Sequence, residues 1–328
     1  MKVASCLVLV LALGASSAAG TVQAVKVPSN FRVERHVAGL DRPTAMAFGP
    51  GGALYLTQEG GEVVRVNPRT RRPRIVLRGF RTPLGLAWYR GVLFVSAQGA
   101  LWRVNGGQRR AIVRRLPFGL HQQDNVVALK GRLFFGSGST CDVCAERSRL
   151  SAAVLSVRPD GSGLRVVARG LRNPFGLAVH PGTGRLYASV NERDKLGRSE
   201  PAETIVEVRQ GRHFGWPRCW PSHRRKRMVG RCRGVTPPVA YLQPHSSPDG
   251  IAFRKGELFV AEWGQYDSRR AGRKVSRVVL RPGRPAAVST FATGFEHPLA
   301  VAVDRRNALL VADYGRGVVY RLQERGKP

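Results

Sequence analysis

The stretch Gly119–Gly138 reads Gly-Leu-His-Gln-Gln-Asp-Asn-Val-Val-Ala-Leu-Lys-Gly-Arg-Leu-Phe-Phe-Gly-Ser-Gly. Two short runs of β-forming residues, Val126–Leu129 and Arg132–Phe135, flank the pair Lys130-Gly131, which is typical of the loop of a tight hairpin. Polar residues stand just before the first run, and His121 is among them. We therefore expect two antiparallel strands with a polar loop at their entrance.

This hairpin is one copy of a unit that occurs six times. The unit is Leu/Phe-x-x-Pro-x-Gly-hydrophobic-Ala-hydrophobic, followed by Gly-x-Leu-aromatic-Val. The copies are Leu40–Thr57, Phe80–Ser96, Leu120–Gly136, Leu171–Ser189, Gln243–Ala261 and Phe295–Ala312. The shared alanines are Ala47, Ala87, Ala128, Ala178, Ala252 and Ala302. The first intervals, 87−47 = 40 and 128−87 = 41 residues, are typical of one four-stranded blade of a β-propeller, and the longer intervals indicate insertions.

The last unit stops at Pro328 without a fourth strand, and Phe31–Ala38, before the first unit, can supply it. Such pairing closes the ring and removes an open sheet edge. The sequence predicts an all-β fold: a six-bladed β-propeller of four-stranded blades, with an N-terminal strand closing the last blade. Residues 25–328 are expected to form this single domain.

The N-terminus has the pattern of a secretory signal peptide. Met1-Lys2 precedes the apolar run Cys6–Leu13 and small residues up to Gly20. Cleavage after Ala19 or Ala24 fits, so residues 1–24 are the predicted signal peptide. The run is too short to span a bilayer, and no later segment is apolar enough. We expect a secreted or periplasmic protein.

Removal of Cys6 leaves Cys141, Cys144, Cys219 and Cys232. An even number of cysteines in an exported chain favours two local disulfides, Cys141–Cys144 and Cys219–Cys232. Other pairings remain open, as does metal binding or redox chemistry at Cys141-Asp142-Val143-Cys144.

The formal net charge is +33, with arginines spread over every segment and one dense run, Arg224–Arg227. Basic residues on one face would indicate nucleic acid, but this scatter and the lack of a reading helix argue against it. Adhesion to acidic polysaccharide or cell-wall surfaces stays open.

In a propeller, loops that enter the innermost strands open on the same face as loops that join second to third strands. The first kind carries His121, Arg172-Asn173 and Ser246-Ser247. The second kind is long at Ser137–Leu150, Asn191–Glu203 and Trp263–Arg273. We expect function at this face. Trp216–Val235 follows a third strand, so simple topology places it on the opposite face, although so long a loop can wrap.

His121 is the candidate base, because a neutral imidazole can take a proton from an alcohol near neutral pH. Arg172, on the next blade, is a cation suited to stabilising negative charge. Each also has a structural interpretation, as a loop histidine satisfying backbone groups and as a turn residue before Asn173-Pro174.

Four acids crowd one loop: Glu192, Asp194, Glu200 and Glu203. They suit Ca²⁺, which takes carboxylate and carbonyl oxygens, or they pair with Arg193, Lys195 and Arg198. No His/Cys spacing indicates zinc, and neither a serine-nucleophile motif nor a phosphate loop is present.

Several motifs together resemble the soluble glucose/sorbosone dehydrogenase family, quinoprotein propellers that use pyrroloquinoline quinone (PQQ) with calcium. The resemblance spans roughly Phe31 to Leu322. The motifs are Leu120-His121-Gln122, Gly136–Cys144, Gly170–Ala178, Asn191–Gly197 and Gly211–Pro217.

The resemblance implies that His121 removes the hydroxyl proton while hydride passes to the quinone, with Arg172 beside both. It implies cofactor contacts at Asn173 and Asn191, and calcium on the main-chain carbonyls of Glu192 and Arg193, where the family has Gly-Pro. Basic residues that grip the quinone carboxylates correspond to Arg273 and Lys274. Where an arginine is usual before the last innermost strand, this chain has Glu296, which would repel a tricarboxylate.

The sequence thus predicts an exported PQQ- and Ca²⁺-dependent dehydrogenase that oxidises a sugar, sugar aldehyde or polyol, with an electron acceptor that the sequence does not specify. Two alternatives remain: a non-catalytic propeller that binds glycan or protein, and a calcium-dependent lactonase-like hydrolase. The hydrolase lacks a clear ring of inward acids and asparagines, one per blade.

Overall fold

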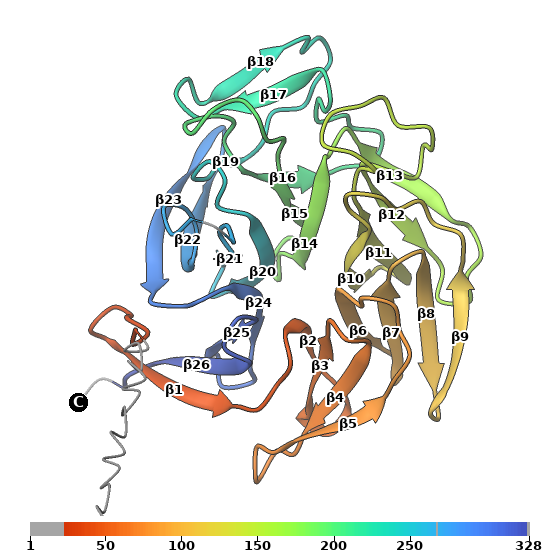
Figure 1. Cartoon of the computed structure of the whole chain (residues 1–328), viewed down its shortest axis with the longest axis vertical. Coiled ribbons are helices and arrows are strands. Elements are labelled where there is room, and N and C mark those ends of the chain that lie inside the picture. The colour runs from red at the N-terminus through yellow and green to blue at the C-terminus, as the bar shows by residue number, and fades with distance from the viewer. Residues whose placement is uncertain (1–22, 267, 327–328) are drawn as a thin grey trace, which may run out of the picture.

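The computed structural model describes residues 23–266 and 268–326. Six four-stranded antiparallel sheets stand radially around a central axis, as Figure 1 shows. The predicted all-β, six-bladed propeller is confirmed.

The strands follow the repeat. Blade one contains β2 (Pro43–Phe48), β3 (Leu54–Gln58), β4 (Glu62–Val66) and β5 (Pro73–Leu77), with a short 3-10 turn η1 (Pro50–Gly52). Blade two contains β6 (Gly85–Tyr89), β7 (Val92–Ala97), β8 (Ala100–Asn105) and β9 (Gln108–Val113). Blade three contains β10 (Gln123–Leu129), β11 (Arg132–Ser137), β12 (Ala153–Val157) and β13 (Arg165–Arg169).

The later blades carry the insertions. Blade four contains β14 (Asn173–Val179), β15 (Leu186–Asn191), β16 (Thr204–Val208) and the short β19 (Ala240–Tyr241). Blade five contains β20 (Pro248–Arg254), β21 (Glu257–Glu262), β22 (Lys274–Arg281) and β23 (Arg284–Thr293). Blade six contains β24 (Pro298–Val303), β25 (Leu309–Asp313), β26 (Val318–Glu324) and β1 (Phe31–Val37).

The innermost strands form a closed ring. Each contacts the next in the order β2, β6, β10, β14, β20, β24, and β24 contacts β2 again. All six repeat alanines lie on these strands. A small side chain suits this position because neighbouring blades converge at the centre of the ring.

The predicted closure of the last blade is confirmed. Strand β1 pairs antiparallel with β26, from Phe31 opposite Glu324 to Val37 opposite Val319. The ring of Phe31 meets that of Phe291 edge-on at 5.0 Å between centroids, in the core between blades five and six. The N-terminal strand therefore contributes apolar packing as well as backbone hydrogen bonds.

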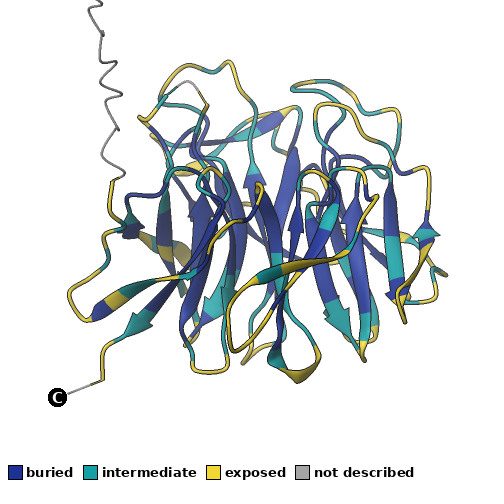
Figure 2. Ribbon diagram, turned by 60° about the horizontal axis from the view of Figure 1, so that its bottom comes forward, coloured by how far each residue is buried: buried dark blue, intermediate teal, exposed yellow. Residues whose placement is uncertain are grey.

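Apolar side chains fill the spaces between adjacent blades, so most strands are buried on both faces (Figure 2). Phe94, Phe135 and Phe259, all on second strands, are almost wholly buried. Truncating such a residue to alanine typically costs about 3–5 kcal/mol. This rigid frame is what holds the loops of one face in place.

Both predicted disulfides, Cys141–Cys144 and Cys219–Cys232, are confirmed. Cys141 and Cys144 also lie close to Glu146, but their sulfur atoms are bonded to each other. That cluster therefore has no free thiolate for a metal.

The simple topological placement of Trp216–Val235 on the opposite face is wrong, because the loop wraps. After β16 the chain runs alongside β13. His213 forms a parallel β-bridge with Arg169, and the backbone N–H of Trp216 donates to the Gly170 carbonyl. The segment then forms the hairpin β17 (Cys219–Ser222) and β18 (Arg227–Gly230). The free edge of β13 supplies hydrogen bonds that a loop on the opposite face would lack.

The predicted signal peptide, residues 1–24, falls almost entirely on residues 1–22, which lie outside the described part. In the described part, no helix has the length and apolar character needed to cross a membrane.

Candidate functional site

A cavity of about 250 Å³ opens on the face where the inner-strand loops and the second-to-third-strand loops meet. Blades three, four and five contribute its walls. Its polar lining includes His121, Arg172, Asn173, Asn191, Glu192 and Glu203. The structure therefore brings the two predicted catalytic residues, from neighbouring blades, to one cavity.

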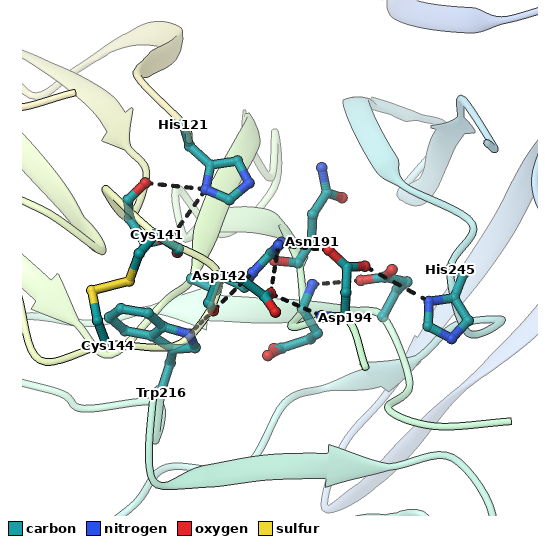
Figure 3. Close-up of polar contacts among 12 residues, drawn as sticks. His121, Cys141, Asp142, Cys144, Asn191, Asp194, Trp216 and His245 are labelled. Atoms are coloured by element: carbon teal, nitrogen blue, oxygen red, sulfur yellow. Dashed lines mark hydrogen bonds and ion pairs between the residues drawn. A yellow bond between two sulfur atoms is a disulfide. The ribbon is translucent and has the colours of Figure 1, made fainter. Parts of the chain in front are cut away.

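His121 stands in the loop before β10, and Ser139 determines its tautomer. The imidazole Nδ1 lies 3.1 Å from the Ser139 carbonyl oxygen and 3.0 Å from its Oγ (Figure 3). The carbonyl can only accept, and the Ser139 hydroxyl already donates to the Cys141 carbonyl. Nδ1 therefore carries the proton, and the lone pair is on Nε2. Nε2 has no hydrogen-bond partner among the described residues.

The surroundings keep His121 neutral. Burial, followed by the positive charge of Arg172, lowers the pKa of His121 to about 3. The imidazole is thus neutral at neutral pH, with its one proton on Nδ1. A base with so low a pKa is a weak one.

Arg172 joins a polar network that includes Asp142, Asn191 and Asp194, and its side chain is only 5% exposed. Its Nη2 lies 2.9 Å from Asp142 Oδ1 and 3.0 Å from Asp194 Oδ2. Its Nε donates to the Asp142 carbonyl and its Nη1 to the Asn191 carbonyl. These contacts join the β11–β12 loop of blade three to the β15–β16 loop of blade four.

Asp142 completes this network. Its Oδ1 accepts the Asp194 N–H at 3.0 Å, and its carbonyl accepts from Trp216 Nε1 at 3.2 Å. Burial alone would raise the pKa of Asp142, but the Asp194 N–H and the Arg172 guanidinium lower it overall. Asp142 therefore remains ionised and holds Arg172 at the cavity wall.

Glu192 and Glu203 are a close acidic pair at the cavity. Glu203 is 5% exposed and its Oε2 accepts the Glu192 N–H. Burial raises the pKa of Glu192 to about 7, and burial together with the charge of Glu192 raises the pKa of Glu203. Neither carboxylate forms an ion pair with a described residue, although the positive charge of Arg172 partly offsets the rise in both pKa values.

The other two acids of that loop have structural partners. Asp194 pairs with Arg172, and Glu200 accepts hydrogen bonds from the Ser222 hydroxyl and the His223 N–H, which fastens the hairpin β17–β18. Among the described ion pairs, none joins the four loop acids to Arg193, Lys195 or Arg198. The guanidinium of Arg193 instead lies over the ring of Trp220, 5.6 Å from its centroid.

Asn173 and Asn191 present oxygens without partners. In the described structure, neither Oδ1 has a hydrogen-bond partner, although both atoms are buried. Asn191 Nδ2 donates to Asp249 Oδ1 at 3.0 Å. An unpaired buried acceptor is costly unless a donor or a cation meets it, so both amides are suited to hold a bound group.

The basic residues expected to grip the quinone lie behind the cavity wall. Arg273 donates to the carbonyls of Glu296 and Gln265, and Lys274 donates to Gln243 Oε1. Neither lines the cavity. Glu296 does not line it either, and its N–H donates to Asp313. A role for Arg273 and Lys274 at the quinone therefore needs these side chains to turn.

The sequence reasoning missed Asp249 as a site residue. Asp249 and Asp124 are buried near the start of the innermost strands β20 and β10, each within a register shift. Burial raises the pKa of Asp249 to about 8, and burial with the charge of Asp249 raises that of Asp124. Outside these two units this position of the repeat is apolar or small, so the charged residue there was the sequence signal for Asp249.

The cavity can be tested against a calcium ion and a quinone. Ca²⁺ takes roughly six to eight oxygen ligands, and Glu192, Glu203 and the unpartnered Oδ1 atoms of Asn173 and Asn191 are oxygens of this kind. Arg172 supplies a cation for a carbonyl or carboxylate. The residues fit a calcium ion beside a carbonyl-bearing cofactor.

Residues 156–268 match the model of the family described as glucose/sorbosone dehydrogenase. The resemblance to that family is confirmed. The matched segment includes Arg172, Asn173, Asn191 and the acidic loop, and it begins after His121. The chain is also 21% identical to an uncharacterised protein of Borreliella burgdorferi, over 83% of this chain and 81% of that protein.

The fold is similar to that of many solved structures, among them the following three. A calcium structure of a Trichoderma reesei family AA12 protein has a TM-score of 0.82 at 16% identity, covering 93% of this chain and 98% of that one. The holo PQQ domain of Coprinopsis cinerea pyranose dehydrogenase has a TM-score of 0.77 at 16% identity, covering 92% of this chain and 97% of that one. The PQQ-bound aldose sugar dehydrogenase of Streptomyces coelicolor has a TM-score of 0.71 at 20% identity, covering 91% of this chain and 100% of that one. At these identities the likeness establishes the fold.

Proposed function

We propose that this chain is an exported sugar dehydrogenase that uses PQQ and Ca²⁺ to oxidise a sugar, sugar aldehyde or polyol. One observation carries the proposal: His121, whose Nε2 has no hydrogen-bond partner among the described residues, and Arg172 line the same cavity from neighbouring blades. The family match and the PQQ-binding structures of similar fold support it. The two disulfides support an oxidising compartment, with residues 25–328 forming the mature domain.

In this mechanism the substrate hydroxyl lies against His121 Nε2, and its carbon loses a hydride as the imidazole takes the proton. Arg172 stabilises the negative charge that develops beside it. Glu192 and Glu203, with the carbonyls of Glu192 and Arg193, would hold calcium, and Asn173 and Asn191 would contact the cofactor. PQQ, when bound, accepts the hydride, and Ca²⁺ makes its carbonyl more electrophilic.

Reconstitution of the purified protein tests this proposal. With PQQ and Ca²⁺ we expect reduction of an electron-accepting dye on adding an aldose, and no reduction when either is left out. A change in quinone absorbance without dye reduction would contradict turnover and favour a propeller that binds without catalysis.

A calcium-dependent hydrolase is the second candidate. The observation that favours it is the presence of buried oxygen donors, Asp124, Asn173 and Asp249, near the starts of three innermost strands. Hydrolysis of a sugar lactone that needs Ca²⁺ and no quinone would support this candidate over the dehydrogenase.

A further inference from the structure

A second, larger hollow adjoins the cavity. This groove encloses about 730 Å³, and His245 and Gln265 border both spaces. A molecule whose reacting end reaches His121 would therefore extend into the groove.

The groove is positively charged. Lys195, Arg198 and Arg270 line it and are exposed, and among the described residues no acid lines it and none pairs with these three cations. Asp267, next to Ser268, lies outside the described residues. The nearby acids have other partners. Asp194 Oδ2 pairs with Arg172 and its Oδ1 lies 4.0 Å from His245 Nδ1 at the border of the groove, while Glu200 binds the hairpin.

The hairpin β17–β18 extends this charge. Its His223 lines the groove, and the following Arg224 and Arg225 are exposed. The Cys219–Cys232 disulfide closes the base of the hairpin, and hydrogen bonds from the Ser222 hydroxyl and the His223 N–H to Glu200 fasten it to the β15–β16 loop. Tyr266, which follows the groove residue Gln265 in the chain, is 77% exposed and packs edge-on against Trp263, 4.4 Å between centroids. An exposed aromatic ring next to a groove residue suits a saccharide better than a bare inorganic anion.

We infer that the groove binds the carboxylate or sulfate of an acidic saccharide whose neighbouring sugar unit enters the His121–Arg172 cavity. The inference rests on the proposed dehydrogenase function for the reaction itself, but not for binding. Cations within hydrogen-bonding reach of an anionic group provide charge-assisted contacts that a neutral sugar cannot make.

Binding is tested first, without quinone, by calorimetry. The ligands are a neutral disaccharide glycoside, the same disaccharide with a terminal uronic acid, and its sulfated counterpart. We expect at least about tenfold tighter binding of one or both anionic forms than of the neutral form. Comparing the two anionic forms shows whether the groove prefers a carboxylate or a sulfate. Equal affinity for neutral and anionic ligands would overturn the inference, whether or not the protein is a dehydrogenase.

Charge reversal locates the site. K195E/R198E/R270E should lose the preference for the anionic ligand. The matched control R90E/K130E/R306E changes the net charge equally at exposed residues of the inner hairpin turns, and it should keep the preference. Loss in both variants would show a non-specific charge effect. Weaker PQQ binding in the groove variant, with unchanged saccharide binding, would assign these cations to the cofactor instead; both outcomes contradict the inference.

With the reconstituted holoenzyme, kcat/KM for the reducing acidic disaccharide should exceed that for its neutral form by a similar factor, again only with the groove intact. Tight anionic binding with no dye reduction would leave the groove assignment standing and contradict the proposed dehydrogenase function.

Discussion

Arg172 and Asp142 form an ion pair in which Nη2 and Oδ1 are 2.9 Å apart. The pair connects the β11–β12 loop of blade three with the loop before β14 of blade four. Asp142 also accepts the Asp194 N–H, so it positions the loop that carries the acidic pair. The pair is therefore the link between the candidate base on one blade and the candidate calcium ligands on the next.

Removing the charge of Asp142 should weaken this link. For Asp142→Asn we expect a loss of about 1–3 kcal/mol in the free energy of unfolding, because Arg172 stays buried with one carboxylate fewer. Asp194→Asn should cost less, about 0–1 kcal/mol, since the Asp194 side chain is 60% exposed. Denaturant titration measures both, and equal losses would show that burial of the pair does not matter.

Replacing His121 should stop turnover without unfolding the protein. His121→Ala removes the proton acceptor, and we expect kcat to fall about 10²–10⁴-fold in the dye assay. His180→Ala is the matched control, because His180 lies on the loop between β14 and β15, away from the cavity. Retained dye reduction by His121→Ala would assign the base to another group.

The titration of His121 should lie far below that of an ordinary histidine. Since burial and Arg172 lower its pKa to about 3, the imidazole is neutral throughout pH 5–8, and the acid limb of kcat/KM due to His121 should appear only near pH 3. Arg172→Gln should move the titration upward by removing a positive charge. NMR of the His121 imidazole protons measures this pKa without an activity assay. A transition of His121 near pH 6.5 in the wild type would contradict the lowered pKa.

Calcium binding should depend on the acidic pair. Ca²⁺ should raise the Tm of the wild type, and Glu203→Gln should weaken the apparent affinity about tenfold or more by removing a ligand charge. Glu200→Gln is a control from the same loop whose carboxylate faces the hairpin, so its Ca²⁺ dependence should match that of the wild type. An unchanged affinity in Glu203→Gln would place the ion elsewhere.

Asp249 should make the metal-free protein less stable as pH rises. Its pKa is about 8 in the folded state and near 4 when unfolded, so between these values only the folded state holds the proton. Stability from this group is complete below pH 4 and is lost on raising the pH towards 8. Asp249→Asn should therefore be stabilised by up to about 5 kcal/mol relative to the wild type at pH 7.5, which is about 3.5 units above the unfolded pKa, and by almost nothing at pH 4. In denaturant titrations in EDTA, Asp41→Asn should behave as the wild type at both pH values.

The ring of blades could be predicted from the chain because it is a local property repeated six times. Each unit carries its own alternation, turn residues and inner alanine, and the strand before the first unit completes the last blade. The disulfides were predictable for the same reason, since each closes a short stretch of chain.

The candidate site could be predicted only as residue types on one face. His121 and Arg172 were expected there because every inner strand starts at that face. The loops that carry Asp142 and Asp194 were expected there too, but their pairing with Arg172 was not, because it depends on how the sheets of blades three and four pack. Sequence spacing likewise could not show that Arg273 turns away from the cavity towards the Glu296 and Gln265 carbonyls.

The sequence by itself determined the blades, their number and the face that carries the polar loops, because these follow from short-range patterns repeated along the chain. The tertiary structure decided which charges meet. The burial of Arg172 among Asp142 and Asp194, the low pKa of His121 and the path of the hairpin β17–β18 beside β13 all arise where segments distant in sequence exclude water from one another.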